Sequence, residues 1–260
     1  MKKLLYLLGS GLIGMMLIIS SCRKDEVKSV SPQLVFQHNV DGATLQRGVM
    51  NYTNLAGNLY QVDELQYFIS EITLRKADGQ LIKISSDSSI HYIDVDIPSS
   101  LVWNPKDQVP SGDYTSISFV FGINEAKNKS GLFVNPPERD MFWPDIMGGG
   151  YHCMKMNGKW KATGDVIQPF NFHIGMGMNM AGTEFYQNYF TVTLPLNIQL
   201  YETHNKIDIT MNIEKWFAAP NLWDWNVIGG QIMMNQEAMH KACQNGANVF
   251  QVSPGIRTNN

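Results

Sequence analysis

Several kinds of protein are excluded by what this sequence has little of. Basic residues are not in excess, because 20 Lys and Arg stand against 23 Asp and Glu and the formal net charge is −3. No basic stripe interleaved with aromatic residues is present either, so we expect no binding of nucleic acid. Internal repeats and low-complexity linkers are also missing, which predicts one domain rather than a repeat array or several domains.

Catalytic signatures are missing as well. The chain has no Gly-x-Ser-x-Gly elbow, no phosphate-binding P-loop, no His-Glu-x-x-His helix and no dinucleotide fingerprint. Carboxylate pairs such as Asp94 with Asp96 are typical of solvated surface charge. We therefore expect a protein that is not an enzyme.

The N-terminal hydrophobic run, Leu4 to Ile19, is too short and too interrupted by Gly and Ser for a transmembrane helix. Two lysines precede it, and Leu17 to Cys22 matches a lipobox, with small residues before a Cys. This pattern predicts a bacterial lipoprotein signal peptide over residues 1–21. The mature chain would begin at Cys22 and be anchored to the membrane by lipid on that residue.

We expect residues 22–30 to form a charged tether that begins at the lipidated cysteine. The run Arg23 to Glu26 resembles the signal that sends some lipoproteins to the outer surface, so we expect an outer-membrane lipoprotein on either its periplasmic or its surface side. Cysteine is otherwise scarce, since only Cys153 and Cys243 remain. An oxidising compartment would permit a disulfide between them; two free thiols, or a sulfur near a metal at Cys153, are the alternatives.

Short apolar or alternating runs separated by Gly, Asn, Asp, Pro and Ser are typical of strands and turns. Their number and spacing predict an all-β fold, a single antiparallel β-sandwich domain over residues 31–252, with a flexible tail over 253–260. A short C-terminal helix is expected over Gln236 to Cys243. The expected strands are 34–38, 64–75, 81–84, 90–95, 114–123, 151–156, 168–173, 190–200 and 206–213.

Two stretches concentrate soft metal ligands. In an extended segment His152, Met154 and Met156 share one face, and His173 is followed by three Met at alternate positions, Met176, Met178 and Met180. Imidazole and thioether together suit Cu(I) better than magnesium, calcium or manganese. The alternative is that Met fills irregular gaps in the core and that each His is a hydrogen-bonded polar group.

Two other segments suggest different roles. The aromatic-rich loop from Trp216 to Trp225 would bind a glycan or a partner protein if it were exposed, although packing in a sandwich corner is the commoner role of such residues. In the C-terminal helix, Met239, His240 and Cys243 lie within one turn of each other. For this helix we favour a packing role over a third metal-ligand cluster, with Met233, Met234 and Met239 buried in the core.

The chain resembles the MbnP-like family, proteins found beside methanobactin genes and more widely as bacterial lipoproteins. The resemblance is carried by the order and coverage of short segments rather than by any one of them. These are Phe36 to Gly42, Asn54 to Asn58, Leu65 to Ser70, Pro110 to Tyr114, Ser118 to Ile123, Met141 to Trp143, Gly149 to Tyr151, Phe172 to Gly175 and Asn245 to Phe250.

The resemblance implies a secreted or lipid-anchored β-sandwich that handles copper through histidines and a Trp oxidised to kynurenine by a dihaem peroxidase-like partner. It points to His38 and His173, and to Trp143 as the oxidised Trp. A second Trp of the family segment is replaced here by Asp145, which puts that oxidation in question and draws attention to His152. We therefore expect copper at His38, His152 and His173, with Met154 or Met176 nearby. Trp160 is an alternative substrate for the haem partner.

Overall fold

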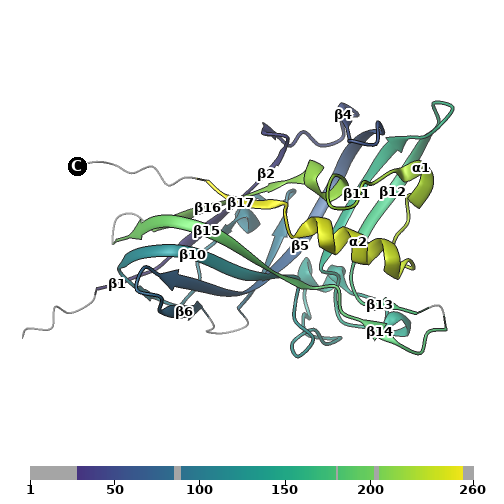
Figure 1. Cartoon of the computed structure of the whole chain (residues 1–260). Helices are drawn as coiled ribbons and strands as arrows, with labels where there is room; N and C mark the ends of the chain where they lie inside the picture. The colour runs from purple at the N-terminus through teal and green to yellow at the C-terminus, as the bar shows by residue number, and fades with distance from the viewer. Residues whose placement is uncertain (1–27, 85–88, 180, 202–204, 254–260) are drawn as a thin grey trace, which may run out of the picture.

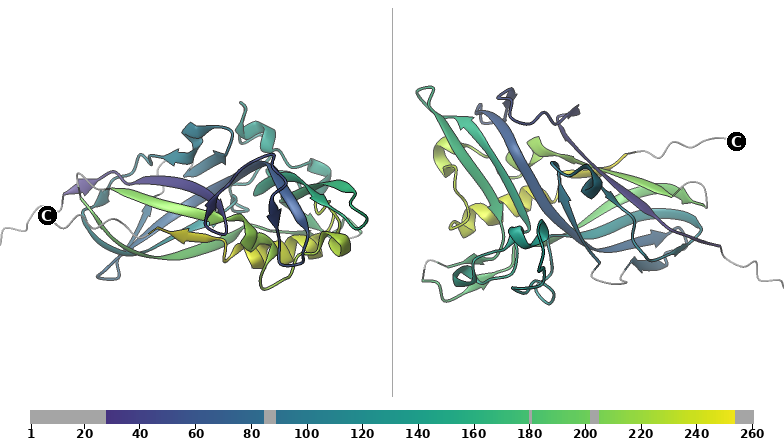
Figure 2. Two further views of the ribbon diagram at one scale, coloured as in Figure 1. Left: turned by 90° about the horizontal axis from the view of Figure 1, so that it is seen from above. Right: turned by 180° about the vertical axis from the view of Figure 1, so that it is seen from behind.

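The computed structural model describes residues 28–84, 89–179, 181–201 and 205–253, and it confirms the predicted all-β sandwich. Two sheets pack face to face, and the C-terminal helix lies beside them (Figure 1). Figure 2 shows the two layers from above and from behind. The predicted signal peptide, Cys22 and Met180 lie outside the described residues.

The larger sheet is built around β5 (Leu59–Lys76). One edge of β5 pairs with β11 (Met154–Lys161) and, further along, with β10 (Gly112–Phe121), because β7 (Ile90–Asp94) lies opposite both. The other strands of this sheet are β4 (Tyr52–Thr53), β6 (Leu81–Ile84), β12 (Ile167–Ile174) and β15 (Phe190–Leu200). Since β10 and β11 share one edge of β5, the chain between them, residues 122–153, must leave the sheet and return beside the same strand.

The smaller sheet has the order β17-β16-β2-β3, and β8 also pairs with β2. Its strands are β17 (Phe250–Val252), β16 (Lys206–Asn212), β2 (Gln33–Val40), β3 (Ala43–Thr44) and β8 (Val102–Trp103). Strands β16 and β2 run parallel, whereas the other pairs between described strands are antiparallel. Two small ribbons complete the strands: β1 (Ser29–Val30) with β9 (Val109–Pro110), and β13 (Gly177–Met178) with β14 (Phe185–Tyr186).

The predicted helix is present as α2 (Gln236–Gly246). Asn235 begins it, because the Asn235 side chain accepts a hydrogen bond from the Ala238 amide. The helix runs past the expected end at Cys243. The remaining turns of helix are short: η1 (Pro98–Leu101), η2 (Glu138–Met141), η3 (Asp145–Met147), η4 (Ile213–Phe217) and α1 (Trp225–Ile228).

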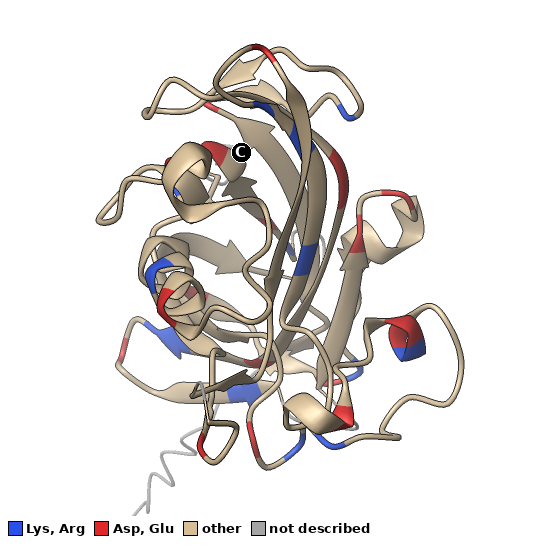
Figure 3. Cartoon of the chain, turned by 90° about the vertical axis from the view of Figure 1, so that its right-hand side faces the viewer, with Lys and Arg blue, Asp and Glu red and all other residues tan. Residues whose placement is uncertain are grey.

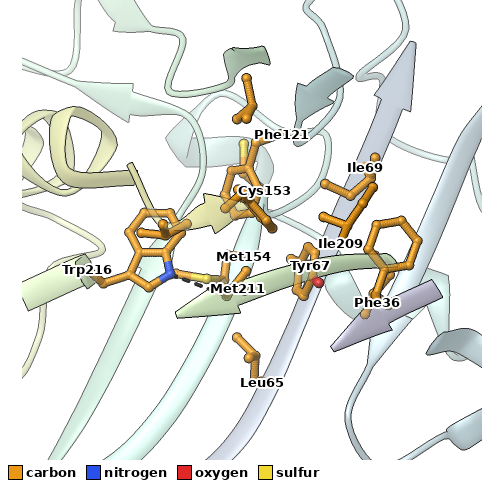
Figure 4. Packing of buried hydrophobic residues seen from close by; sticks show 14 of the residues in the cluster. Phe36, Leu65, Tyr67, Ile69, Phe121, Cys153, Met154, Ile209, Met211 and Trp216 are labelled. Carbon is orange, nitrogen blue, oxygen red and sulfur yellow. Dashed lines mark hydrogen bonds between the residues drawn. The ribbon is translucent and has the colours of Figure 1, made fainter. Parts of the chain in front are cut away.

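The main core lies between the sheets. Leu34, Phe36 and Val40 of β2 are buried while Gln37 is exposed, as expected when alternate side chains face opposite sides. Figure 4 shows Phe36 packed in one cluster with Tyr67 of β5, Met154 and Trp216. The Trp216 indole donates from Nε1 to Met211 Sδ at 3.4 Å.

A second, smaller cluster covers the opposite face of β5. Because Tyr67 points into the main core, its neighbour Phe68 points away from it. The cluster consists of Phe68, Tyr92, Ile123, Met141 and Tyr151. Three of these residues, Ile123, Met141 and Tyr151, come from segment 122–153, so this part of the segment is packed onto the outer face of the larger sheet.

The basic and acidic residues are interspersed along the ribbon in Figure 3, in agreement with the near-balanced composition. None of the helices in the described part of the chain is long and apolar enough to cross a membrane.

Candidate metal centre

Segment 122–153 folds back on itself beside the larger sheet. The Trp143 amide donates to the Gly150 carbonyl at 2.8 Å, and the His152 amide donates to the Met141 carbonyl at 2.8 Å, so residues 141–143 run alongside residues 150–152. The return needs Gly150, which has a φ of 82° and where a Cβ would lie 2.6 Å from Asn128 Oδ1. This turn places Trp143 and His152 next to each other.

The His152 ring has one partnered and one unpartnered nitrogen. Nδ1 lies 2.9 Å from the Met141 carbonyl oxygen, which can only accept, so Nδ1 carries the proton of the neutral ring. Nε2 is buried without a hydrogen-bond partner, and the residue is only 4% exposed. A buried acceptor left unpaired costs free energy, so an ion that accepts this lone pair would relieve that cost.

His173 approaches His152 from β12. Its ring centroid lies 5.1 Å from that of His152, with an interplanar angle of 83°. His173 Nε2 donates to Asn157 Oδ1 at 2.7 Å, which leaves Nδ1 as the lone-pair nitrogen of the neutral ring. Each of these two neighbouring rings therefore has one nitrogen with a free lone pair.

Burial keeps both rings neutral. It lowers the pKa of His152 to about 3 and, together with the nearby charge of Lys155, lowers the pKa of His173 to about 4. Lys155 pairs in register with His173 across the sheet, and its ammonium donates to the Asp140 carbonyl. Metal ions bind the neutral form of imidazole, so the rings need not lose a proton near neutral pH before they coordinate.

Trp143 packs against the ring of His152. The indole is fully buried, its ring centroid lies 4.6 Å from that of His152, and Nε1 donates to the Met147 carbonyl at 3.1 Å. Gly175 lies under the ring, since a Cβ there would be 2.3 Å from Trp143 Cε3. Trp143, His152 and His173 therefore lie together in the structure.

His38 is not part of this group. It lies on β2, where Nε2 shares a 3.0 Å hydrogen bond with the Tyr67 hydroxyl, and Tyr67 points into the main core. His173 pairs with Lys155, one residue on from the inward-facing Met154, so it projects from the other face of the larger sheet. The expectation of one three-histidine site is therefore wrong for the described residues, which hold no cluster of three or more His, Cys, Asp or Glu ligands.

The methionines are also distributed differently from the sequence-based expectation. Strand β11 begins only at Met154, so His152 is not held to the face of Met154 and Met156, and both Met side chains are buried in the main core. Met176 is partly buried and its sulfur accepts from Gln187 Nε2 at 3.3 Å. The predicted packing of Met239 is present, but Met234 is 69% exposed.

Both described cysteines are free thiols, Cys153 buried and Cys243 partly buried. Burial raises the pKa of the Cys153 thiol to about 12. Its sulfur belongs to the main core, as Figure 4 shows, whereas His173 lies on the other side of the sheet. Cys153 is thus not oriented toward the two histidines.

The aromatic loop turns inward. Trp216, Trp223 and Trp225 are at most 2% exposed, and Trp225 packs against Tyr60 and Phe170 at centroid distances of 5.4 and 5.0 Å. These rings have no open face on which a sugar could stack. The loop therefore has the packing role that was the commoner alternative.

The model of the MbnP family matches residues 29–240. The chain belongs to the MbnP family. Among solved structures, MbnP from Methylosinus trichosporium has the same fold, with a TM-score of 0.52 at 15% identity over 75% of this chain and 80% of that chain. None of the curated proteins matches the chain significantly. The family match confirms the resemblance seen in the sequence.

Two polar residues beside the centre of this MbnP-family protein were not singled out from the sequence. Asn157 Nδ2 donates to Glu64 Oε2 at 2.7 Å, while Asn157 Oδ1 accepts from His173. Alternation along β11 could have placed Asn157 on the face of Lys155. Glu64 is brought there only by the register of β5 with β11, which the local sequence does not encode.

The pH dependence of stability tests the burial of His38. Burial lowers the pKa of His38 from its ordinary value of 6.5 to about 4. As the pH falls, His38 is therefore protonated in the unfolded chain before it is protonated in the folded one. The free energy of unfolding keeps its full contribution from His38 above pH 6.5 and loses it as the pH falls toward 4. Lowering the pH from 7 to 4 should decrease the free energy of unfolding of both proteins. We expect this decrease to be about 2–3 kcal/mol smaller in the His38→Gln variant than in the wild type.

Urea unfolding at both pH values measures this difference, and each protein serves as its own reference at pH 7. Parallel losses in the two proteins would show that His38 is not kept neutral by the fold.

Proposed function

We propose that this MbnP-family protein is a non-catalytic copper-binding protein of the cell envelope, which captures or passes Cu(I) through His152 and His173. The observation that carries the proposal is the buried, unpartnered Nε2 of His152, 4% exposed as a residue and beside a second neutral imidazole. An ion that accepts this lone pair would remove the cost of leaving it unpaired. The family resemblance to copper-handling proteins points in the same direction.

The donor set favours Cu(I) over other ions. Structural Zn²⁺ sites use about four protein ligands, and the part of the chain that the structure describes adds no third His, Cys, Asp or Glu to the pair. Mg²⁺ and Ca²⁺ require oxygen ligands, which two imidazoles do not supply. Two neutral nitrogen donors beside the apolar Trp143 ring suit a soft monovalent ion that accepts few ligands.

The lipobox at Cys22 supports an envelope location on an outer-membrane lipid anchor, facing the periplasm or the surface. The position of Trp143, buried with its ring 4.6 Å from His152, supports its assignment as a residue that a dihaem peroxidase-like partner would oxidise to kynurenine. The aromatic-loop hypothesis has no such support, because its Trp rings are buried.

Anaerobic titration of the purified protein with Cu(I), in competition with a chromophoric chelator, tests the proposal. We expect one ion per chain, bound more tightly than micromolar, and loss of that binding in the double variant His152→Ala/His173→Ala. Binding no tighter than micromolar, or binding unchanged in the double variant, would contradict it. Mass spectrometry of the native protein before titration reports whether Trp143 is oxidised, and an unmodified Trp in cells that make the haem partner would count against that assignment.

A further inference from the structure

Three side chains form a continuous hydrogen-bonded line across the outer face of the larger sheet. They come from adjacent strands, Glu64 from β5, Asn157 from β11 and His173 from β12. Glu64 Oε2 accepts from Asn157 Nδ2 at 2.7 Å, and Asn157 Oδ1 accepts from His173 Nε2 at 2.7 Å. The register places Asn157 directly opposite Glu64, so the first contact is between facing residues.

The direction of each bond follows from what the groups can do. An ionised carboxylate only accepts, so the Asn157 amide must turn its NH₂ toward Glu64 and its oxygen toward His173. An oxygen facing the ring requires a proton on His173 Nε2. The lone pair of the neutral ring is then on Nδ1.

We infer that Glu64 and Asn157 are positioning residues that fix His173 as the Nε2–H tautomer and so present its Nδ1 to the ion held with His152. This inference rests on the proposed function for its purpose. Hydrogen-bond partners behind a ligating His commonly change metal affinity by about 10- to 100-fold when removed. A carboxylate that acts through an amide supplies orientation without placing its negative charge against the ion.

Two substitutions of Glu64 separate hydrogen bonding from charge. Glu64→Gln removes the charge but keeps an oxygen that accepts from Asn157, so the tautomer should be retained. Glu64→Lys offers only donors, which should turn the Asn157 amide around and place its NH₂ against His173. The Nε2 of His173 must then accept, and the proton moves to Nδ1. Glu64 is exposed, so neither substitution disturbs the core.

The test reads the tautomer in the metal-free folded protein from ¹H–¹⁵N correlation spectra of the imidazole rings. We expect His173 to carry its proton on Nε2 in the wild type and in Glu64→Gln, and on Nδ1 in Glu64→Lys. Cu(I) affinity should fall about tenfold or more in Glu64→Lys and change less than threefold in Glu64→Gln. In an Asn157→Ala background, Glu64→Lys should no longer affect the tautomer, because the effect passes through Asn157.

The outcomes separate this inference from the proposed function. A His173 tautomer that stays the same in folded Glu64→Lys would overturn the inference while leaving wild-type Cu(I) binding intact. Loss of affinity in both Glu64 variants, with no change of tautomer, would assign the effect to charge and also overturn it. A tautomer that switches in a protein that does not bind Cu(I) would overturn the proposed function alone.

Discussion

Replacing His152 with alanine is expected to lower the Cu(I) affinity at least about 100-fold, because the substitution removes a ligand rather than a supporting residue. His152 contributes the buried lone pair on Nε2, and the described residues offer no neighbouring His, Cys, Asp or Glu to make a third ligand. The matched control is His38→Gln, which alters a histidine of similar burial, 9% against 4% exposed, on the opposite side of the sheet. We expect that control to stay within about threefold of the wild type.

Comparing His152→Ala with His38→Gln shows which of the two histidines binds the ion, which the sequence alone does not decide. Chelator competition gives both affinities, and circular dichroism establishes that each variant is folded. Equal losses in His152→Ala and His38→Gln would mean that the ion gathers all three histidines, contrary to their separation by the larger sheet.

The largest expected effect on stability comes from Trp216. The indole is fully buried, packs against Phe121 and Phe172 at centroid distances of 5.4 and 5.8 Å, and donates to Met211 Sδ. Trp216→Ala would remove these contacts and leave a cavity beside the two sheets. We expect the free energy of unfolding to fall by about 3–5 kcal/mol.

The matched control for this variant is Leu222→Ala in the same loop, where the side chain is 57% exposed and the change should stay within about 0.5 kcal/mol. Urea unfolding monitored by circular dichroism measures both. A Trp216→Ala protein as stable as the wild type would show that the loop is not part of the core, and would restore the case for an exposed aromatic surface.

Much of the architecture could be predicted because strands and turns leave local signals. Alternating apolar residues, as in Leu34 to His38, and the Gly, Asn, Asp, Pro and Ser residues between such runs predicted strands that the structure contains as β2, β5 and β6. The helix signal of Gln236 to Cys243 was also local. Its end was placed too early because Asn245 and Gly246 are both buried in the last turn, where packing outweighs their low helix propensity.

The site was predicted only in part. His152, His173 and Trp143 were all singled out, and the structure brings them together. His38 and Met154 were assigned to the same site because one-dimensional spacing does not tell which face of a sheet a side chain occupies once strands are paired. Their inward orientation is set by the register of β5, β11 and β2, which is a property of the folded chain.

The sequence by itself determined the composition, the strand and helix periodicity and the membership of the MbnP family, since these depend on residues that are close along the chain or on the order of short segments. Tertiary structure alone decided which donors meet. The glycine turn of segment 122–153 places His152 beside His173 on the outer face of the larger sheet, whereas His38, on β2 of the smaller sheet, is buried against Tyr67. Ligand convergence depends on long-range strand register and on the loop joining β10 to β11, and neither is encoded by nearest neighbours.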